Sequence, residues 1–168
     1  RGEYKNVTGS SECVSCPANS DAPAGSDAIS DCQCVAGYTG PDGGACTACA
    51  AGTFKPSAGS ASCANTCPAN SISEPASDEI ADCKCNAGYT RNDGGVCTAC
   101  VAGFFKARVG DEACTACPVN MDSVVVASVT DTDCQCNKGY AGADGGTCQA
   151  CTQKAELVAA FMKRQKQL

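Results

Sequence analysis

Cysteine spacing constrains the fold of this chain more than any other feature of its sequence. The 168 residues include 18 cysteines, which form three sets of six beginning at Cys13, Cys63 and Cys114, a period of 50 to 51 residues. Such a period is typical of an elongated array in which each repeat contacts mainly its neighbours. The sets are Cys13, Cys16, Cys32, Cys34, Cys46 and Cys49; Cys63, Cys67, Cys83, Cys85, Cys97 and Cys100; and Cys114, Cys117, Cys134, Cys136, Cys148 and Cys151.

Large apolar residues are too scarce for a conventional core. Leu, Ile, Val and Phe together number 21, there is no tryptophan, and the formal net charge is −6. Such a chain would stay disordered unless something other than apolar burial held it together. Disulfides can do so, because each short closed loop contributes about 2 to 4 kcal/mol. We therefore predict a small disulfide-rich fold in which cross-links replace most of the core.

The same cysteines predict an oxidising compartment, so we expect the chain to be extracellular or on a cell surface. Asn6-Val7-Thr8 matches the acceptor sequence for N-linked glycans, and Asn6 is therefore a candidate glycosylation site. Serines and threonines in the loops are further candidates. The sequence has no initiator methionine and no apolar run long enough to span a bilayer. We expect a processed or excised soluble piece, with any anchor elsewhere.

Recurring stretches divide the chain into three predicted repeats, at 1–49, 50–100 and 101–151, and a tail at 152–168. Asp-Gly-Gly recurs at 42–44, 93–95 and 144–146, and this triplet is typical of hairpin turns. We expect short two-stranded β-ribbons rather than a large sheet. Regularly placed aromatic residues are predicted to cover disulfides and to form small local cores: Tyr38, Phe54, Tyr89, Phe105 and Tyr140.

Metal and redox sites fit this pattern poorly. Cys-x-x-Cys is a zinc-binding spacing, but the chain contains no histidine, and six cysteines per repeat do not divide into groups of four. A redox pair at Cys13 and Cys16, or at Cys46 and Cys49, would need a helix N-terminus to lower a thiol pKa, and the sequence supplies none. The acidic residues before Cys32, Cys83 and Cys134 do not match a calcium-binding pattern, so we interpret them as solvated loop charges. We predict no metal and no cofactor.

Residues for catalysis or nucleic-acid binding are also missing. Without histidine there is no Ser-His-Asp triad, and the sequence has neither a phosphate-binding loop nor a basic patch over the repeats. We therefore predict that the chain is not an enzyme and binds no nucleic acid.

Two segments resemble known cysteine-rich modules. Cys34-x-x-Gly-Tyr followed by Asp-Gly-Gly-x-Cys46, with copies at 85–97 and 136–148, resembles the last loop of an EGF-like module. Cys49-x-x-Gly-x-Phe-Lys-x-x-x-Gly-x-x-x-Cys63 is similar to the first loop of TNF-receptor-like and ephrin-receptor-like repeats. Over residues 1–151 the chain resembles tandem arrays in protist and algal surface proteins. The resemblance implies an elongated array of three EGF/TNF-receptor-like repeats.

The resemblance also implies a disulfide pairing, which spacing alone cannot fix. The implied pairs are Cys34–Cys46, Cys85–Cys97, Cys136–Cys148, Cys16–Cys32, Cys67–Cys83, Cys117–Cys134, Cys49–Cys63 and Cys100–Cys114.

Cys13 and Cys151 are left over by this pairing. The pattern places the partner of Cys13 just before Arg1 and the partner of Cys151 in a following repeat. One interpretation is an inter-subunit disulfide between Cys151 of one copy and Cys13 of the next, which would build an open-ended head-to-tail homopolymer. Three alternatives stay open: the chain is a fragment of a longer array, the two cysteines bond within one chain despite its elongation, or the implied connectivity is shifted.

The tail differs from the repeats. Residues 152–168 lack Gly, Pro and Cys and are rich in helix formers, which predicts a C-terminal amphipathic α-helix. This helix could pack on Val124, Val125, Val126 and Val129 of its own repeat, contact a partner subunit, or lie on a membrane surface. We favour the partner subunit, because the repeats are acidic and the tail is basic. Its predicted apolar stripe is Leu157, Val158, Phe161, Met162 and Leu168.

Two functional hypotheses follow. In the first, the chain is a structural protomer of an extracellular filament or coat, for which the resemblance suggests mastigoneme-like flagellar hairs or a surface fibre. In the second, it is a fragment of a longer cysteine-rich receptor or adhesion ectodomain. The first predicts unusual chemistry at the ends of the array, and the second predicts a repeat with an unusual exposed face.

Overall fold

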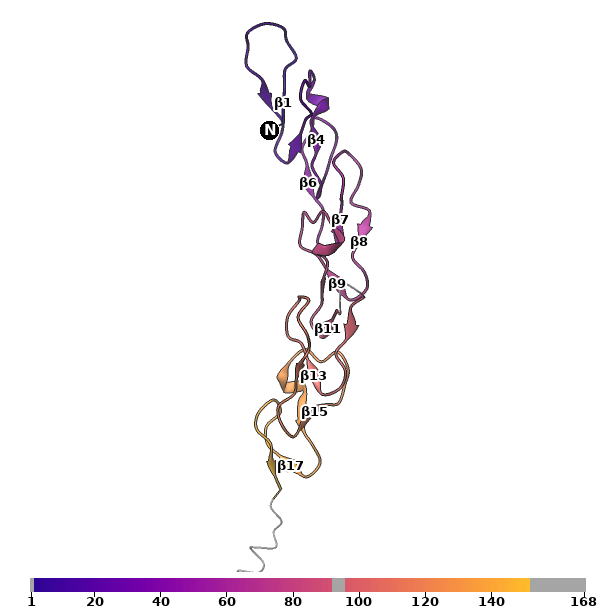
Figure 1. The fold of residues 1–168 in the computed structure, drawn as a ribbon, viewed down its shortest axis with the longest axis vertical. Coiled ribbons are helices and arrows are strands. Elements are labelled where there is room, and N and C mark those ends of the chain that lie inside the picture. The colour runs from indigo at the N-terminus through magenta and orange to yellow at the C-terminus, as the bar shows by residue number, and fades with distance from the viewer. Residues whose placement is uncertain (1, 92–95, 152–168) are drawn as a thin grey trace, which may run out of the picture.

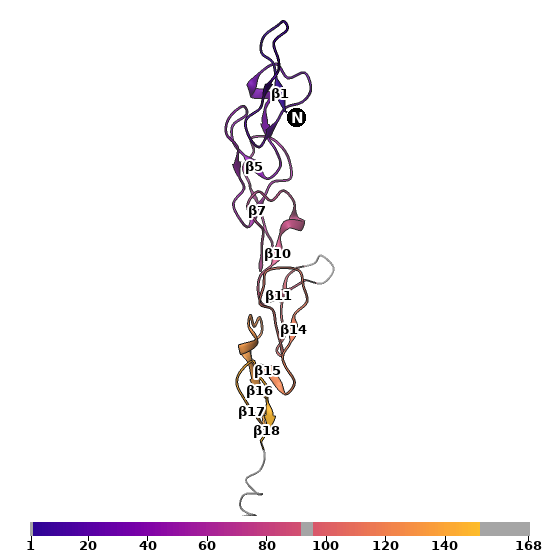
Figure 2. The ribbon, with the colours of Figure 1, turned by 90° about the vertical axis from the view of Figure 1, so that its left-hand side faces the viewer.

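A chain of stacked hairpins forms a long, narrow rod (Figure 1), and the quarter-turn view in Figure 2 is equally narrow. The computed structural model describes residues 2–91 and 96–151. Strand β1 (Glu3–Tyr4) lies toward one end of the rod and strand β17 (Tyr140–Ala141) toward the other. The predicted elongated array is observed in this part of the chain.

Every sheet in the described residues is a two-stranded antiparallel hairpin of consecutive strands. Each repeat supplies three hairpins, so the pattern recurs three times along the rod. The first hairpins are β1 with β2 (Val14–Ser15), β7 (Thr53–Phe54) with β8 (Asn65–Thr66), and β13 (Phe104–Phe105) with β14 (Thr115–Ala116). The second are β3 (Ser20–Asp21) with β4 (Gln33–Cys34), β9 (Ser71–Ile72) with β10 (Lys84–Cys85), and β15 (Met121–Ser123) with β16 (Cys134–Cys136). The third are β5 (Tyr38–Thr39) with β6 (Thr47–Ala48), β11 (Tyr89–Thr90) with β12 (Thr98–Ala99), and β17 with β18 (Gln149–Ala150).

The structure contains eight disulfides, and they are the eight pairs that the family resemblance implies. Each bond joins two cysteines that are consecutive among the bonded ones, so no disulfide loop encloses another. Because strands of two or three residues are marginal by themselves, these closures hold the hairpins together. The bonds are Cys16–Cys32, Cys34–Cys46, Cys49–Cys63, Cys67–Cys83, Cys85–Cys97, Cys100–Cys114, Cys117–Cys134 and Cys136–Cys148.

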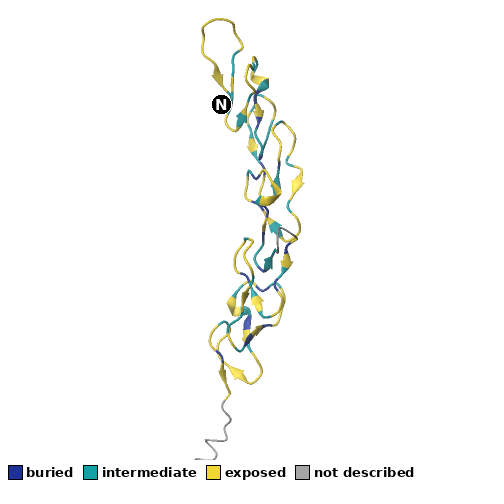
Figure 3. Cartoon of the chain, in the orientation of Figure 1, coloured by how far each residue is buried: buried dark blue, intermediate teal, exposed yellow. Residues whose placement is uncertain are grey.

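Disulfide-bonded cysteines make up nearly all of the buried apolar residues. Buried positions are few and are spread along the rod (Figure 3). Cys34, Cys83, Cys85 and Cys134 are each 0% exposed, and Met121 is the one other apolar residue in the buried core of the described chain. A single small cluster forms in the third repeat, where Phe105 packs against the buried Met121 and Cys134. The prediction that cross-links replace most of the core agrees with this burial.

The regularly placed aromatic residues are less buried than their spacing suggests. Tyr38 and Tyr89 are half-buried, but Tyr140 is 36% exposed at the C-terminal end of the described rod. Tyr140 therefore forms no local core of its own. The difference follows its position, because Tyr38 and Tyr89 are followed by another described repeat and Tyr140 is not.

Three short 3-10 helices precede the second strand of the second hairpins, and an aspartate organises each of them. Asp31 accepts hydrogen bonds from the backbone amides of Asp27 and Ala28, both at 3.1 Å. Asp82 and Asp133 make the same pair of bonds in their repeats. The interpretation of these acidic residues as solvated charges was therefore incomplete, because each carboxylate caps a turn. The helices are η1 (Ile29–Asp31), η2 (Ile80–Asp82) and η3 (Asp131–Asp133).

The Asp-Gly-Gly triplets form the predicted tight turns where they are described. Gly43 has φ +73° and Gly145 has φ +70°, a conformation that favours glycine. The Gly43 amide donates to the Cys32 carbonyl at 2.7 Å, which fastens the turn beside η1. In the second repeat, residues 92–95 lie outside the described chain.

The predicted C-terminal helix, including its stripe Leu157, Val158, Phe161, Met162 and Leu168, also lies outside the described residues. Within residues 2–91 and 96–151, no helix has the length and apolar character needed to cross a bilayer.

Candidate functional site

The junctions between repeats are built around two buried lysines. Lys55 is 2% exposed, and its ammonium donates to the carbonyl of Tyr38 at 2.8 Å and to that of Gly59 at 2.6 Å. Lys106 is 5% exposed and makes the equivalent bonds to Tyr89, at 2.7 Å, and to Gly110. A buried ammonium needs several acceptors, and these carbonyls supply them. Each lysine therefore ties its own hairpin to the preceding repeat.

Burial lowers the pKa of Lys106 below its usual value, while the carboxylates of Glu112 and Asp111 act in the opposite direction. The sequence shows these lysines only as part of the repeated Gly-x-Phe-Lys motif. Their spacing in the motif could have marked them, but it does not show that they are buried or that the tyrosine carbonyl of the preceding repeat is one of their acceptors.

A close backbone approach accompanies each lysine. A Cβ atom on Gly37 would lie 2.2 Å from the Ala76 carbonyl oxygen, and one on Gly88 would lie 2.4 Å from that of Ala127. Both glycines have φ +79°, so a side chain is disfavoured at these positions for two reasons. The contact lets the third hairpin of one repeat lie directly against the second hairpin of the next.

Backbone hydrogen bonds repeat at both junctions with nearly the same lengths. Gly37 donates to Lys55 at 2.9 Å, Ala76 to Cys49 at 3.0 Å, and Gly59 to Cys34 at 2.8 Å. The three counterparts in the second junction are each 2.8 Å long: Gly88 to Lys106, Ala127 to Cys100, and Gly110 to Cys85. We call this set of a buried lysine, a glycine contact and three amide bonds the junction.

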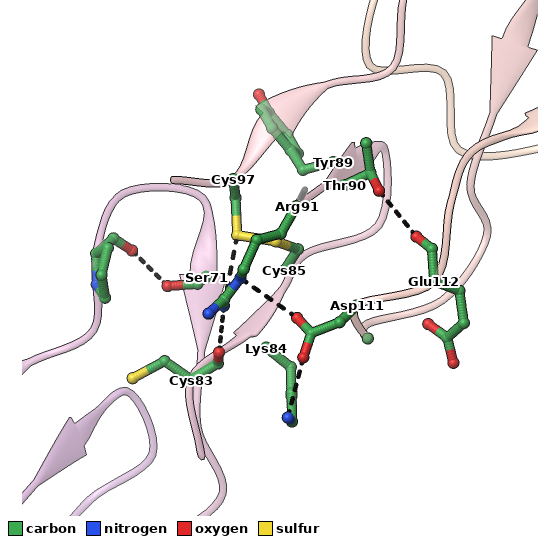
Figure 4. A network of polar contacts seen from close by, with 12 residues as sticks. Ser71, Cys83, Lys84, Cys85, Tyr89, Thr90, Arg91, Cys97, Asp111 and Glu112 are labelled. Atoms are coloured by element: carbon green, nitrogen blue, oxygen red, sulfur yellow. Dashed lines mark hydrogen bonds and ion pairs between the residues drawn. A yellow bond between two sulfur atoms is a disulfide. The ribbon is translucent and has the colours of Figure 1, made fainter. Parts of the chain in front are cut away.

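The second junction adds a group of charges that the first one lacks (Figure 4). Asp111 accepts a hydrogen bond from Lys84 at 3.0 Å and lies 3.5 Å from the Arg91 Nε atom. Arg91 also donates to the carbonyl of Cys83. The hydrogen bond from Lys84 is the main cause that lowers the Asp111 pKa, and the charges of Arg91 and Lys84 act in the same direction.

At the first junction the corresponding residues are Gln33, Gly40 and Ser60, which cannot form this network. The charges of Lys84, Arg91 and Asp111 therefore occur at the second junction only and are not among the contacts that both junctions share.

Cys13 and Cys151 are both exposed and form no disulfide among the described residues. Cys13 precedes β2, the partner of β1 at one end of the rod, and Cys151 follows β18, the partner of β17 at the other end (Figure 1). Because a disulfide requires neighbouring Cα atoms, this rod keeps the two thiols of one chain apart. Cys13 occupies the position of Cys63 and Cys114, and Cys151 the position of Cys49 and Cys100.

The remaining predicted sites lie apart from the junctions. Asn6 is exposed in the loop between β1 and β2, where a glycan has room. Val124, Val125, Val126 and Val129 are also exposed. Among the described residues, no group of three or more histidine, cysteine or acidic side chains could hold a metal ion.

Comparison with known proteins identifies the repeat. The profile of one family, described as tyrosine-protein kinase ephrin type A/B receptor-like, matches residues 37–83 and 88–134. These two stretches make up more than half of the chain. The chain belongs to this family. Each ephrin-receptor-like match runs from the junction glycine, Gly37 or Gly88, through the junction lysine to Cys83 or Cys134. The family unit therefore contains the lysine, the glycine contact and two of the three amide bonds of a junction, because Cys34 and Cys85 precede the matched stretches. It also crosses the predicted boundaries at residues 49 and 100.

Individual relatives share the ephrin-receptor-like repeats with this chain. Ephrin type-A receptor 4-B of Xenopus laevis is 42% identical over 65 residues, which are 39% of this chain and 6% of that protein. Ephrin type-B receptor 4 of Homo sapiens is 42% identical over 64 residues, or 38% of this chain and 6% of the receptor. Cysteine repeat modular protein B of Toxoplasma gondii is 35% identical over 92 residues, which are 53% of this chain and 1% of that protein.

The chain thus spans only a small fraction of the length of these relatives. The matched stretches are cysteine-rich repeats without an evident catalytic domain. Together with the eight disulfides, the ephrin-receptor-like repeats indicate an extracellular location.

Proposed function

We propose that this chain is a structural protomer of an extracellular filament or surface coat, in which copies join head to tail. The position of the two free cysteines carries the proposal. At both internal junctions a disulfide, Cys49–Cys63 or Cys100–Cys114, joins the end of one repeat to the first hairpin of the next. Cys151 and Cys13 are the two separate halves of such a bond, exposed at opposite ends of the rod.

A bond from Cys151 of one copy to Cys13 of the next would join their repeats as Cys49–Cys63 and Cys100–Cys114 join repeats within a chain. Further copies could be added in the same way without limit. A contact between two different surfaces of identical subunits does not close on itself, so it builds an open-ended fibre. A surface fibre or a mastigoneme-like hair is an assembly of this type. The tail at 152–168 stays a predicted assembly helix.

Formation of this bond requires an oxidant. Two thiols give one disulfide with the loss of two protons and two electrons, and a small-molecule or protein disulfide accepts them and becomes two thiols. An oxidising extracellular or secretory compartment supplies disulfides of this kind.

A second function is supported by the relatives. Their names include receptors, and each is far longer than this chain, so the chain could be a stretch of a longer receptor or adhesion ectodomain. In that case the exposed valines of the third repeat are the surface that would face a ligand. The test below separates the two functions.

Electrophoresis of native material with and without reductant tests the proposal. We expect a ladder of disulfide-linked species that collapses to one band on reduction, and mass spectrometry of non-reduced peptides should link Cys151 to Cys13. The variant Cys13→Ser should fold with its eight internal disulfides and give no ladder, because Cys13 lies outside those bonds. A ladder of equal yield from Cys13→Ser would refute the bond. Peptides that run continuously past Arg1 or Leu168 would instead favour the receptor or adhesion function.

A further inference from the structure

The C-terminal end of the described rod carries one half of a junction. Gly139 corresponds to Gly37 and Gly88, yet a Cβ atom placed on it would meet nothing within 4 Å. No described residue accepts a hydrogen bond from its amide, whereas the amides of Gly37 and Gly88 donate to lysine carbonyls of the next repeat. The exposed Tyr140 corresponds to the tyrosines whose carbonyls bind the buried lysines. This end therefore presents a tyrosine carbonyl that could accept a bond from a lysine, and a glycine that could lie against the next repeat.

The N-terminal end carries the other half. Lys5 corresponds to Lys55 and Lys106, but it is only half-buried, and its ammonium donates to the Gly9 carbonyl and to no tyrosine carbonyl among the described residues. Gly25 corresponds to Ala76 and Ala127 and has φ +87°, and a Cβ atom placed on it would also meet nothing within 4 Å. The hairpin around Lys5 is folded as in the later repeats, since the Lys5 amide donates a hydrogen bond to the Ser26 carbonyl at 3.1 Å.

The chemistry of the two ends matches the first internal junction in particular. The charged residues Lys84, Arg91 and Asp111 of the second junction have uncharged counterparts, Gln33, Gly40 and Ser60, in the first. At the ends of the rod the same positions are Gln135, Gly142 and Ser10, which are the residue types of the first junction.

The local structure agrees, because a Cβ atom on Gly142 would be 3.3 Å from the Cys136 sulfur, as one on Gly40 would be from the Cys34 sulfur. Neither end of the rod therefore has a charged residue at these three positions that would need an opposite charge on the other end.

We propose that a second copy of this chain docks on the C-terminal end in the register of the internal junctions, with Lys5 as the residue that anchors it. This inference rests on the proposed head-to-tail function and adds the contacts that guide it. The Lys5 ammonium bonds the Tyr140 carbonyl of the other copy, and the Gly139 amide donates to the Lys5 carbonyl. Gly25 donates to the Cys151 carbonyl and lies against Gly139. Docking in this register brings Cys13 beside Cys151 before the disulfide forms.

One internal contact has no counterpart in the docked pair. The hydroxyl of Thr39 donates to the Ala61 carbonyl at 2.9 Å, and that of Thr90 donates to Glu112 at 3.0 Å. The equivalent residue at the C-terminal end is Ala141, which has no hydroxyl. The docked junction therefore has one hydrogen bond fewer than an internal one.

The rate at which Cys13 and Cys151 cross-link in a glutathione redox buffer tests the docked register with the full chain. Lys5→Met should slow cross-linking by roughly tenfold, which is the loss expected for a charge-assisted hydrogen bond. Arg108→Met removes the same charge at an exposed position that makes no junction bond, and its rate should equal that of the wild type. Alkylation of Cys13 by iodoacetamide should proceed equally in all three chains, which excludes a change in thiol reactivity.

A second pair of variants tests the glycine contact. Gly139→Ala should also slow cross-linking, because the new methyl group would meet the carbonyl of Gly25 in the docked pair. Gly25→Ala should leave the rate unchanged, since alanine already occupies this position at both internal junctions, with φ +65° at Ala76 and +59° at Ala127. Peptide mapping that finds Cys136–Cys148 intact would show that Gly139→Ala is folded.

The outcomes separate the register from the proposed function. If the wild type forms no Cys13–Cys151 bond at any concentration, the head-to-tail function fails. If the wild type, Lys5→Met and Gly139→Ala all cross-link at one rate, the function stands and the docked register is wrong. If Lys5→Met and Gly139→Ala cross-link more slowly than the wild type, and Arg108→Met and Gly25→Ala cross-link at the wild-type rate, the docked register is supported.

Discussion

Individual charged residues act at the junctions in two different ways. Lys55 and Lys106 are buried and satisfied by backbone carbonyls, so they are part of the packing at both junctions. Asp111 is 39% exposed, and its ion pairs with Lys84 and Arg91 occur at one junction only. Exposed ion pairs are screened by salt and contribute little each. The buried lysines therefore define the junction, and the ion pairs adjust the stability of one of them.

Acidification should loosen the second junction more than the first. The Asp111 pKa is lowered in the folded chain from its ordinary 3.8, so its contribution is complete above that value and is lost as the pH falls through the lower folded-state pKa. Amide hydrogen exchange measures this: protection of the Gly110 amide should fall in acid relative to that of Gly59, its counterpart in the uncharged junction. Asp111→Asn should abolish the difference. Parallel loss of protection at Gly59 and Gly110 would contradict the prediction.

Hairpins are the units of this structure, and their contacts along the rod depend on glycine. The strands have only two or three residues, which is too short to be stable without support. Disulfides close the hairpins, while the contact of Gly88 with Ala127 sets how closely successive hairpins approach. Backbone atoms meet there directly, so the spacing of the hairpins cannot adjust to a larger residue.

Gly88→Ala and Gly139→Ala form a matched pair that measures this contact. Both glycines have positive φ, so alanine costs about 1 to 2 kcal/mol of strain at either position. Only at Gly88 would the methyl group also meet the Ala127 carbonyl. Protection of the Ala127 amide against hydrogen exchange should fall by more than about tenfold in Gly88→Ala, which corresponds to about 1.4 kcal/mol. In Gly139→Ala it should be unchanged. Full protection of the Ala127 amide in Gly88→Ala would contradict the prediction.

The whole rod is a series of locally closed loops. The disulfide loops follow one another without nesting, and each hairpin pairs strands that are neighbours in sequence. Stability is therefore distributed along the rod, as in other repeat proteins, rather than concentrated in one core. This organisation also allows a rod to be lengthened by further junctions without any change to its interior.

Removal of one disulfide should accordingly have a local effect. The variant Cys67→Ser/Cys83→Ser opens a loop with a sequence separation of 16 residues, which should cost the β9–β10 hairpin about 3 kcal/mol. We expect hydrogen-exchange protection to be lost in this hairpin and kept in the equivalent hairpins β3–β4 and β15–β16. Peptide mapping should find the other seven bonds unchanged. Scrambled pairing along the whole chain would contradict the independence of the loops.

Much of this architecture follows from the sequence alone. The period of the cysteines indicates three repeats, the shortage of large apolar residues excludes a conventional core, and the family resemblance implies all eight pairs found in the structure. These features depend on residue type and spacing, which a linear pattern records directly. Cys13 and Cys151 could be recognised as unmatched for the same reason.

Only the tertiary structure decided what happens between repeats. Lys55 and Lys106 each bond a tyrosine carbonyl of the preceding repeat as well as a glycine carbonyl of their own. Gly37 and Gly88 lie against alanines 39 residues later in the sequence. The aspartates before Cys32, Cys83 and Cys134 cap turns for a similar reason, since backbone amides converge on them. These roles depend on groups brought together by folding, and the spacing of cysteines carries no information about which carbonyl or amide will face a given side chain.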